Sequence, residues 1–252
     1  SAARSTQEKV GLILRNQIAA FMTTLSNIAK RIPGESQPIE NDAKITPSTK
    51  SPNRKKRTQT QDRHKRFVKW IIGTFPHVMN DSKAEVGKHI LDVASGKGET
   101  AARLAMCHQI KVMMIEPRLC NVEATYKSKV LSKLPIKWQQ SMAAHLVEDP
   151  GFLSNKIQSL VSHIYMCFTD DTVANNIYLQ DALANSSLLL GLHADNATEA
   201  IIDAALQYNL PFVVVPCCVF GNFFPDRRLE DGTHIMSYED FIEYLLQRDS
   251  RF

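Results

Sequence analysis

One segment, residues 89–105, constrains the fold more than any other part of this 252-residue chain. Its sequence, HILDVASGKGETAARLA, begins with the apolar residues of a buried strand, continues through a turn of small residues, and ends in a helical pattern. Small residues let a ligand approach the backbone of such a turn, and the first helical turn offers N–H groups without intrahelical partners. The segment therefore predicts a strand–turn–helix unit that can bind a ligand.

Short apolar runs alternate with helical patterns from residue 89 onward. The runs that predict strands are residues 89–93, 111–115, 136–139, 187–192 and 211–216. The patterns that predict helices are residues 100–107, 121–131 and 198–208. This alternation indicates an α/β fold with a doubly wound, mostly parallel sheet, and such sheets bind ligands at the carboxyl ends of their strands.

Composition excludes several classes of protein. With 44% hydrophobic and 22% charged residues, the chain is neither collagen-like nor wholly disordered. No window approaches the roughly 18 consecutive apolar residues of a membrane span, so we expect no membrane association. The five cysteines are scattered and form no CxxC pair. That spacing fits neither a disulfide framework nor a zinc finger, so we expect a reducing intracellular compartment and no metal ion, with mitochondrion, cytoplasm and nucleus all open.

Residues 1–61 have the character of an N-terminal extension. Apolar residues at spacings of three and four over residues 6–31 predict a helix that ends at a Pro-Gly pair. Residues 33–61 are rich in Pro, Ser, Thr and charge, which is typical of a linker. We therefore place the main domain at residues 62–252, with its first helix beginning near Asp62.

Positive charge is concentrated between residues 50 and 69, which contain nine Lys or Arg and one acid, for a local charge of +8. The whole chain carries only +4, so the remainder carries 4 − 8, or −4. A basic arm on a mildly acidic body is typical of proteins that contact phosphate backbones, because the contacts release condensed counterions. We expect RNA as the partner, with a solvated charge run or a targeting signal as the alternative. The residues expected to contact RNA are Arg54, Lys55, Lys56 and Arg57.

Two acidic residues stand at the ends of the first two predicted strands, Asp92 and Glu116. An acid at the second position can accept hydrogen bonds from both ribose hydroxyls of a nucleoside bound across the strand ends. A dinucleotide would use the same geometry, but Asp92 would repel a pyrophosphate, and Ala94 replaces the first glycine of the dinucleotide pattern. Both features favour S-adenosylmethionine, whose ammonium group Asp92 could bind. The expected cofactor-binding residues are Asp92, Ala94, Ser95, Gly96, Gly98, Glu116 and Pro117.

With these residues in place, the chain resembles the class I S-adenosylmethionine-dependent methyltransferases. The strings DRHKRFVKWI, LDVASGKGE, IEPR, GLHADNATEAIIDAA, PFVVVPCCVFGNFFPDRRL and SYEDFIEYL look like a little-characterised family related to the tRNA 2′-O-methyltransferases. Members carry a Leu-His motif after strand four and a Cys-Cys motif after strand five. The resemblance covers residues 62–252, and because members usually continue into a final strand pair, it implies that C-terminal strands are lacking here.

The resemblance also implies a catalytic cleft beside the ends of strands four and five. His193 and Asp195 would be catalytic, with His193 able to take a proton from a hydroxyl acceptor. Pro216, Cys217 and Cys218 would contact the substrate. Alternative interpretations remain open for each residue type: His193 can be a satisfied interior histidine, and the cysteines can be small core residues.

The first functional hypothesis is therefore methyl transfer from S-adenosylmethionine to RNA, tRNA or rRNA, with the basic arm holding the substrate. The alternative is a subunit or assembly factor of an RNA–protein particle, such as a mitochondrial ribosome, that has lost turnover. A methyltransferase for small molecules or proteins would leave the arm without a role. The absence of an N/D-P-P-Y/F signature argues against an amine acceptor. Ser141 and Met142 mark the place where the adenine contact is expected.

Overall fold

The computed structural model describes residues 62–82, 87–219, 224–250 and 252. Among the described residues, those from Asp62 to Cys218 belong to one compact unit, and those from Val219 onward belong to another. The predicted helix at residues 6–31, the linker and the four predicted RNA-contacting residues Arg54 to Arg57 lie outside the described residues.

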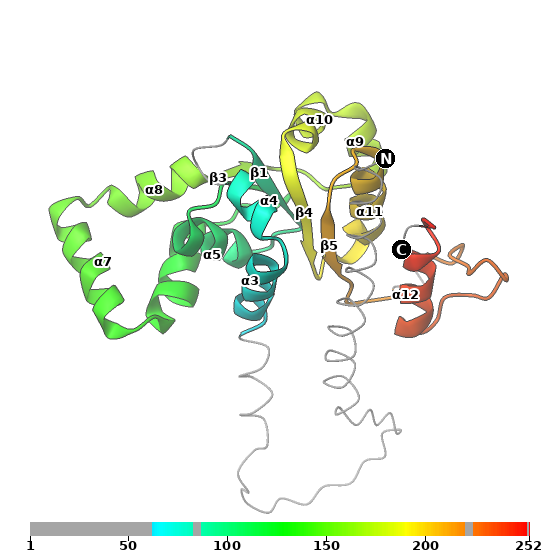
Figure 1. Ribbon diagram of the computed structural model, residues 1–252, viewed down its shortest axis with the longest axis horizontal. Helices are drawn as coiled ribbons and strands as arrows, with labels where there is room; N and C mark the ends of the chain where they lie inside the picture. The colour runs from blue at the N-terminus through cyan, green and yellow to red at the C-terminus, as the bar shows by residue number, and fades with distance from the viewer. Residues whose placement is uncertain (1–61, 83–86, 220–223, 251) are drawn as a thin grey trace, which may run out of the picture. The chain divides into compact units, whose positions relative to one another are not determined.

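Five parallel strands form a single sheet in the order β3-β2-β1-β4-β5 (Figure 1). The strands are β1 (His89–Val93), β2 (Val112–Ile115), β3 (Val161–Ile164), β4 (Ser186–Leu192) and β5 (Phe212–Val215). The chain runs outward from β1 to β3 and then crosses back to β4, so the strand order reverses between β1 and β4. In sheets of this type the ligand crevice lies at that reversal, at the carboxyl ends of the strands. The predicted α/β fold with a parallel sheet is confirmed.

Helices flank the sheet and connect its strands (Figure 1). Before the third strand come α3 (Arg63–Thr74), α4 (Pro76–Asp81), α5 (Glu99–His108), α6 (Val122–Thr125), the π-helical η1 (Tyr126–Val130), the 3-10 helix η2 (Leu131–Lys133), α7 (Ile136–Glu148) and α8 (Phe152–Leu160). After it come α9 (Asp170–Asn175), α10 (Ile177–Ala184), the 3-10 helix η3 (Asp195–Ala197) and α11 (Thr198–Gln207), while α12 (Tyr238–Leu246) belongs to the second unit.

The alternation of side chains along β1 divides its residues between two faces. Leu91 and Val93 belong to a buried cluster that also contains residues of α9, α10 and α11. Because successive strand residues point to opposite faces, Ile90 and Asp92 point the other way. Asp92 therefore lies on the face that carries α5, and the backbone of Ala101 in that helix hydrogen-bonds to it.

The structure corrects the predicted third strand. Residues 136–139 begin helix α7, and the third strand is Val161–Ile164 instead. Pro135 immediately precedes the helix as its N-cap and favours a helix start, whereas four residues of mixed polarity carry little strand signal. As a result Ser141 and Met142, the positions marked for the adenine contact, lie within α7 and do not follow a strand.

Helix α7 extends away from the sheet in Figure 1, and none of its residues is fully buried. Its contact with the core is made by Met142 and Leu146, which are partly buried against residues of α5 and α8. Ile136, Trp138 and Val147 are exposed. Helix α7 is thus attached to the domain by one partly buried edge.

The second unit contains helix α12, whose N-terminus is closed by a capping box between Ser237 and Asp240. Within this unit the Arg227 guanidinium lies 3.6 Å from the centre of the Phe224 ring and 5.0 Å from that of Phe241. Across both units, none of the helices in the described residues is long and apolar enough to cross a membrane.

Candidate functional site at the strand ends

The turn between β1 and α5 contains three residues in the left-handed region. Ala94, Gly96 and Gly98 have φ values of 53°, 58° and 73°. Glycine adopts this conformation without steric cost, whereas for alanine it costs on the order of 1 kcal/mol. A Cβ atom at Gly98 would lie 3.0 Å from Cε of Met114 and 3.2 Å from Cγ2 of Val122. The sequence pattern D-x-A-x-G-x-G thus specifies a turn whose backbone is tightly packed at Gly98.

Hydrogen bonds hold this turn in place. The Ser95 hydroxyl donates to the carbonyl oxygen of Asp92. The Thr125 hydroxyl donates to the carbonyl oxygen of Lys97 at 2.8 Å, which connects the turn to helix α6. The predicted residues Ala94, Ser95, Gly96 and Gly98 are therefore all part of one constrained loop.

Asp92 is buried at the end of β1, with 2% of its surface exposed. Burial raises the pKa of its carboxyl to about 7; the nearby Glu116 also raises it, and the Ala101 backbone hydrogen bond opposes the shift. Within the described part of the chain, its Oδ2 atom has no hydrogen-bond partner. A buried carboxylate oxygen without a partner is unfavourable, so a hydrogen-bond donor or a cation that reached it would be stabilised there.

Glu116 follows β2 and is 1% exposed. Its Oε2 accepts a hydrogen bond from the backbone N–H of Gly96 at 2.9 Å, which joins the second strand end to the glycine turn. Burial by itself would raise the pKa of Glu116, but hydrogen bonds from Arg118 and Gly96 outweigh it and the pKa is lowered. Asp92 and Glu116 thus lie at one end of the sheet, and their environments shift their pKa values in opposite directions.

Arg118 covers the Glu116 carboxylate. Its Nε lies 2.6 Å from Oε1 and its Nη2 lies 3.1 Å from Oε2, while its backbone N–H also donates to Oε1. These are the oxygens that the sequence pattern predicts as acceptors for ribose hydroxyls. The Arg118 side chain is 77% exposed, and an exposed guanidinium is readily displaced because water solvates it well. Pro117, between the two, is exposed.

Helix α3 places a histidine, His64, beside the start of α5. Nδ1 of His64 is 2.9 Å from the Thr100 hydroxyl in the first turn of α5. Burial lowers the pKa of His64 to about 4, with Arg63, Arg103 and His193 contributing and Glu99 opposing. His64 was missed by the sequence analysis because it stands within the charged string DRHKRF. A histidine in a run of arginine and lysine was the available signal.

His193 is the first residue after β4. Its backbone N–H donates to the carbonyl oxygen of Val215 at 3.0 Å, so β4 and β5 remain side by side at their ends. Burial lowers the pKa of the His193 imidazole, as does Arg63, while Asp195 opposes the shift. The imidazole is therefore neutral at pH 7 and able to accept a proton.

The residues predicted beyond β4 and β5 also meet. The Cys217 thiol donates a hydrogen bond to Oδ1 of Asp195 at 2.9 Å. Burial raises the pKa of Cys217, and the contacts with Asp195 and Cys218 raise it further. Cys217 is therefore a thiol near neutral pH, which does not suit a covalent nucleophile. Pro216 is buried at the end of β5.

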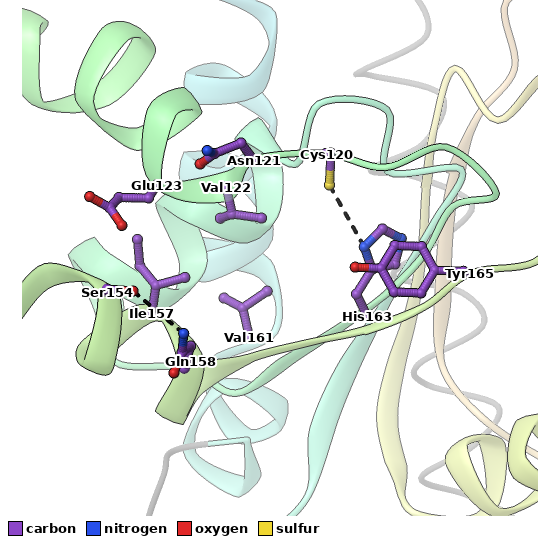
Figure 2. Close-up of a pocket in the computed structure, with 10 residues that line it drawn as sticks. All are labelled: Cys120, Asn121, Val122, Glu123, Ser154, Ile157, Gln158, Val161, His163 and Tyr165. Carbon is purple, nitrogen blue, oxygen red and sulfur yellow. Dashed lines mark hydrogen bonds between the residues drawn. The ribbon is translucent and has the colours of Figure 1, made fainter.

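A cavity of 420 Å³ lies beside the edge strand β3 (Figure 2). It is lined by Cys120, Asn121, Val122, Glu123, Ser154, Ile157, Gln158, Val161, His163 and Tyr165. None of these described lining residues belongs to the predicted cofactor set. No sequence pattern predicted this cavity, because two of the residues that line it, Val161 and His163, belong to β3, which was not predicted as a strand.

His163 connects this cavity to the residue that follows β2, Glu116. Its Nε2 lies 2.8 Å from the carbonyl oxygen of Glu116, and because a carbonyl only accepts, Nε2 carries the proton. Nδ1 is then the acceptor for the Cys120 thiol, 3.8 Å away, and the Tyr165 ring lies 3.9 Å from the His163 ring (Figure 2). A lining residue of the cavity is thus hydrogen-bonded to the backbone of Glu116.

No protein-family model matches the chain, and searches of curated proteins and of solved structures find no match. The strand order and the glycine turn are those of a Rossmann-like parallel α/β fold, and this fold is compatible with nucleotide-binding enzymes.

Proposed function

We propose that this chain is an S-adenosylmethionine-dependent methyltransferase that acts on RNA. The observation that carries the proposal is the unpartnered Oδ2 atom of Asp92, a buried carboxylate oxygen at the carboxyl end of the first strand. The ammonium group of the cofactor's methionine portion would supply the missing hydrogen bond and a compensating charge. A pyrophosphate would do the opposite, so the contact favours a sulfonium nucleoside over a dinucleotide.

The remaining residues of the turn fit such a ligand. A Cβ atom at Gly96 would have no other atom within 4 Å, so this side of its backbone can be approached closely, and the first turn of α5 presents N–H groups to a carboxylate. Glu116 would accept the ribose hydroxyls once Arg118 moves aside. When bound, the cofactor supplies an electrophilic methyl group, and the protein's contribution is alignment of the acceptor.

On the acceptor side, His193 would take the proton of a ribose hydroxyl while the oxygen of that hydroxyl receives the methyl group. The lowered pKa of His193 keeps the imidazole free to accept that proton at neutral pH. The resemblance to ribose methyltransferases and the presence of a neutral histidine both favour a hydroxyl acceptor. We include Asp195 because it raises the pKa of His193 and so favours the imidazolium formed in the transfer.

The basic face of α3 supports RNA as the acceptor. Four cationic side chains of this helix are exposed: Arg63, Lys65, Arg66 and Lys69. The hydrogen bond between His64 and Thr100 places the start of α3 beside the glycine turn, so the cations stand near the proposed site of chemistry. A polyanion bound along α3 would release counterions, and its ribose groups would reach the strand ends.

A second candidate function rests on Arg118. Because this side chain occupies the Glu116 oxygens, the chain could instead be a subunit or assembly factor of an RNA–protein particle that retains the fold without turnover. Such a protein would bind RNA and would not bind the cofactor.

Calorimetry with two ligands separates these functions. S-Adenosylhomocysteine contains the ammonium group, whereas 5′-methylthioadenosine lacks the entire amino-acid portion. We expect Asp92→Asn to weaken S-adenosylhomocysteine binding about ten- to hundredfold, the range for a lost charge-assisted hydrogen bond, with methylthioadenosine unaffected. Glu148→Gln, on the exposed end of α7, is the control. Absence of S-adenosylhomocysteine binding at millimolar concentration would contradict the enzyme and favour the scaffold.

The RNA contact is tested separately by filter binding over a range of salt concentrations. Lys65→Ala should lower the logarithmic salt slope by about 0.7–0.9, the value for one phosphate contact. Lys88→Ala is the matched control, because Lys88 precedes β1 at the opposite end of the sheet. Equal slopes for both variants and the wild type would exclude α3 from the RNA interface.

A further inference from the structure

Three side chains of metal-binding type meet where β4 and β5 end. One ligand atom each from Asp195, Cys217 and Cys218 lies within 4.8 Å of the other two. The sheet register explains the meeting: Leu192 pairs with Val215, so the segments that follow leave the sheet side by side. Positive φ at His193 and Asp195, 57° and 49°, then turns the first segment sharply at this point.

We propose that Asp195, Cys217 and Cys218 bind a divalent cation that prefers sulfur ligands. In the cell this ion would be Zn²⁺. Two sulfur atoms and one carboxylate oxygen form a donor set that selects zinc over magnesium or calcium. This assignment replaces the expectation of no metal ion, which depended on the absence of a CxxC pair. It does not rest on the proposed methyltransferase function.

The distances favour the site. With Zn–S near 2.3 Å and Zn–O near 2.1 Å, two ligand atoms of one tetrahedral ion lie about 3.6–3.8 Å apart. All separations among the three atoms are at most 4.8 Å, so each pair needs to change its separation by no more than about 1 Å to reach this geometry. The contact between Cys217 and Asp195 already holds two of them together at 2.9 Å, with a proton where the ion would bind.

Access and coordination number are also consistent with an ion that exchanges a ligand. Asp195 and Cys218 are exposed, so the ion can enter from solvent. Binding replaces the thiol protons, which pass to the solvent, and involves no oxidation or reduction. Three protein ligands leave a fourth tetrahedral position for water or for an oxygen of the substrate, as in catalytic zinc sites.

Cobalt substitution tests the site in the full-length, reduced protein. Titration with Co²⁺ should produce a thiolate-to-metal charge-transfer band that saturates at one equivalent and disappears when Zn²⁺ is added. Cys217→Ser and Cys218→Ser should each remove about half of the band intensity, and Asp195→Asn should weaken binding at least tenfold. Cys167→Ser is the matched control, because Cys167 is an exposed free thiol elsewhere in the fold.

Three outcomes would overturn the proposal: no charge-transfer band, a band that Cys167→Ser removes, or a band that keeps its full intensity in both Cys217→Ser and Cys218→Ser. Because Cys218 is exposed, its variant is expected to keep the wild-type circular dichroism spectrum, so a lost band would report lost binding. Asp92→Asn should retain full cobalt binding, which separates failure of this site from failure of the cofactor site.

Discussion

Replacing Gly98 by alanine should destabilise the protein more than replacing Gly96, although both glycines lie in one turn with positive φ. The left-handed conformation costs alanine about 1–2 kcal/mol at either position. At Gly96 the new Cβ has nothing within 4 Å, whereas at Gly98 it meets Met114 and Val122 at 3.0 Å and 3.2 Å. Overpacking adds about 1 kcal/mol, the low end of its range, because the Met114 side chain is flexible.

We therefore expect Gly98→Ala to lower the free energy of unfolding by about 2–3 kcal/mol and Gly96→Ala by about 1–2 kcal/mol. The difference of about 1 kcal/mol should appear as a gap of roughly 2–4 °C between the two melting temperatures. Urea denaturation followed by fluorescence, with thermal melts in parallel, measures both quantities. Equal losses for the two variants, or a larger loss for Gly96→Ala, would refute the packing argument.

Two further predictions concern the carboxylates of Glu116 and Asp92. Arg118→Ala should leave Glu116 open to ribose and strengthen S-adenosylhomocysteine binding several-fold by calorimetry; weaker binding would mean that Arg118 holds the nucleoside. Because burial raises the pKa of Asp92 from 3.8 to about 7, the stability that this group contributes to the ligand-free protein is fully present below pH 3.8 and is lost as the pH rises toward 7. Affinity for an ammonium-bearing ligand should accordingly increase as the pH rises through 7, and Asp92→Asn should abolish that dependence.

Local signals made the first half of the site predictable from sequence. The strand, the glycine turn and the start of α5 are contiguous, so residues 89–105 alone place Asp92 beside the turn. The contact between Arg118 and Glu116 joins residues two positions apart, yet it depends on a side-chain rotamer that no sequence pattern specifies. Strand β3 was missed because its four residues, VSHI, are half polar and lie at the sheet edge, where burial is incomplete.

The second half of the site, after β4 and β5, could be predicted only in part, because it is formed by contacts between segments that are distant in the sequence. The sequence placed Asp195 and Cys217 after two successive strands of the sheet, but their 2.9 Å hydrogen bond depends on the register between β4 and β5. His64 approaches Thr100 across 36 residues, which only the docking of α3 on α5 explains. From charge alone, α3 was predicted to be part of a basic arm. Charge gives no indication that the His64 side chain of this helix reaches the strand ends.

Helix α7 shows that cooperativity is uneven within the domain. With no fully buried residue, its 13 residues depend mainly on their own backbone hydrogen bonds, at a length where isolated helices are marginal in water. The strands of the parallel sheet, in contrast, are stabilised by buried side chains from several helices, so they cannot open separately from the core. Amide protons of α7 should therefore exchange with deuterium through local opening, long before those of β1 and β4, which exchange only when the whole sheet unfolds.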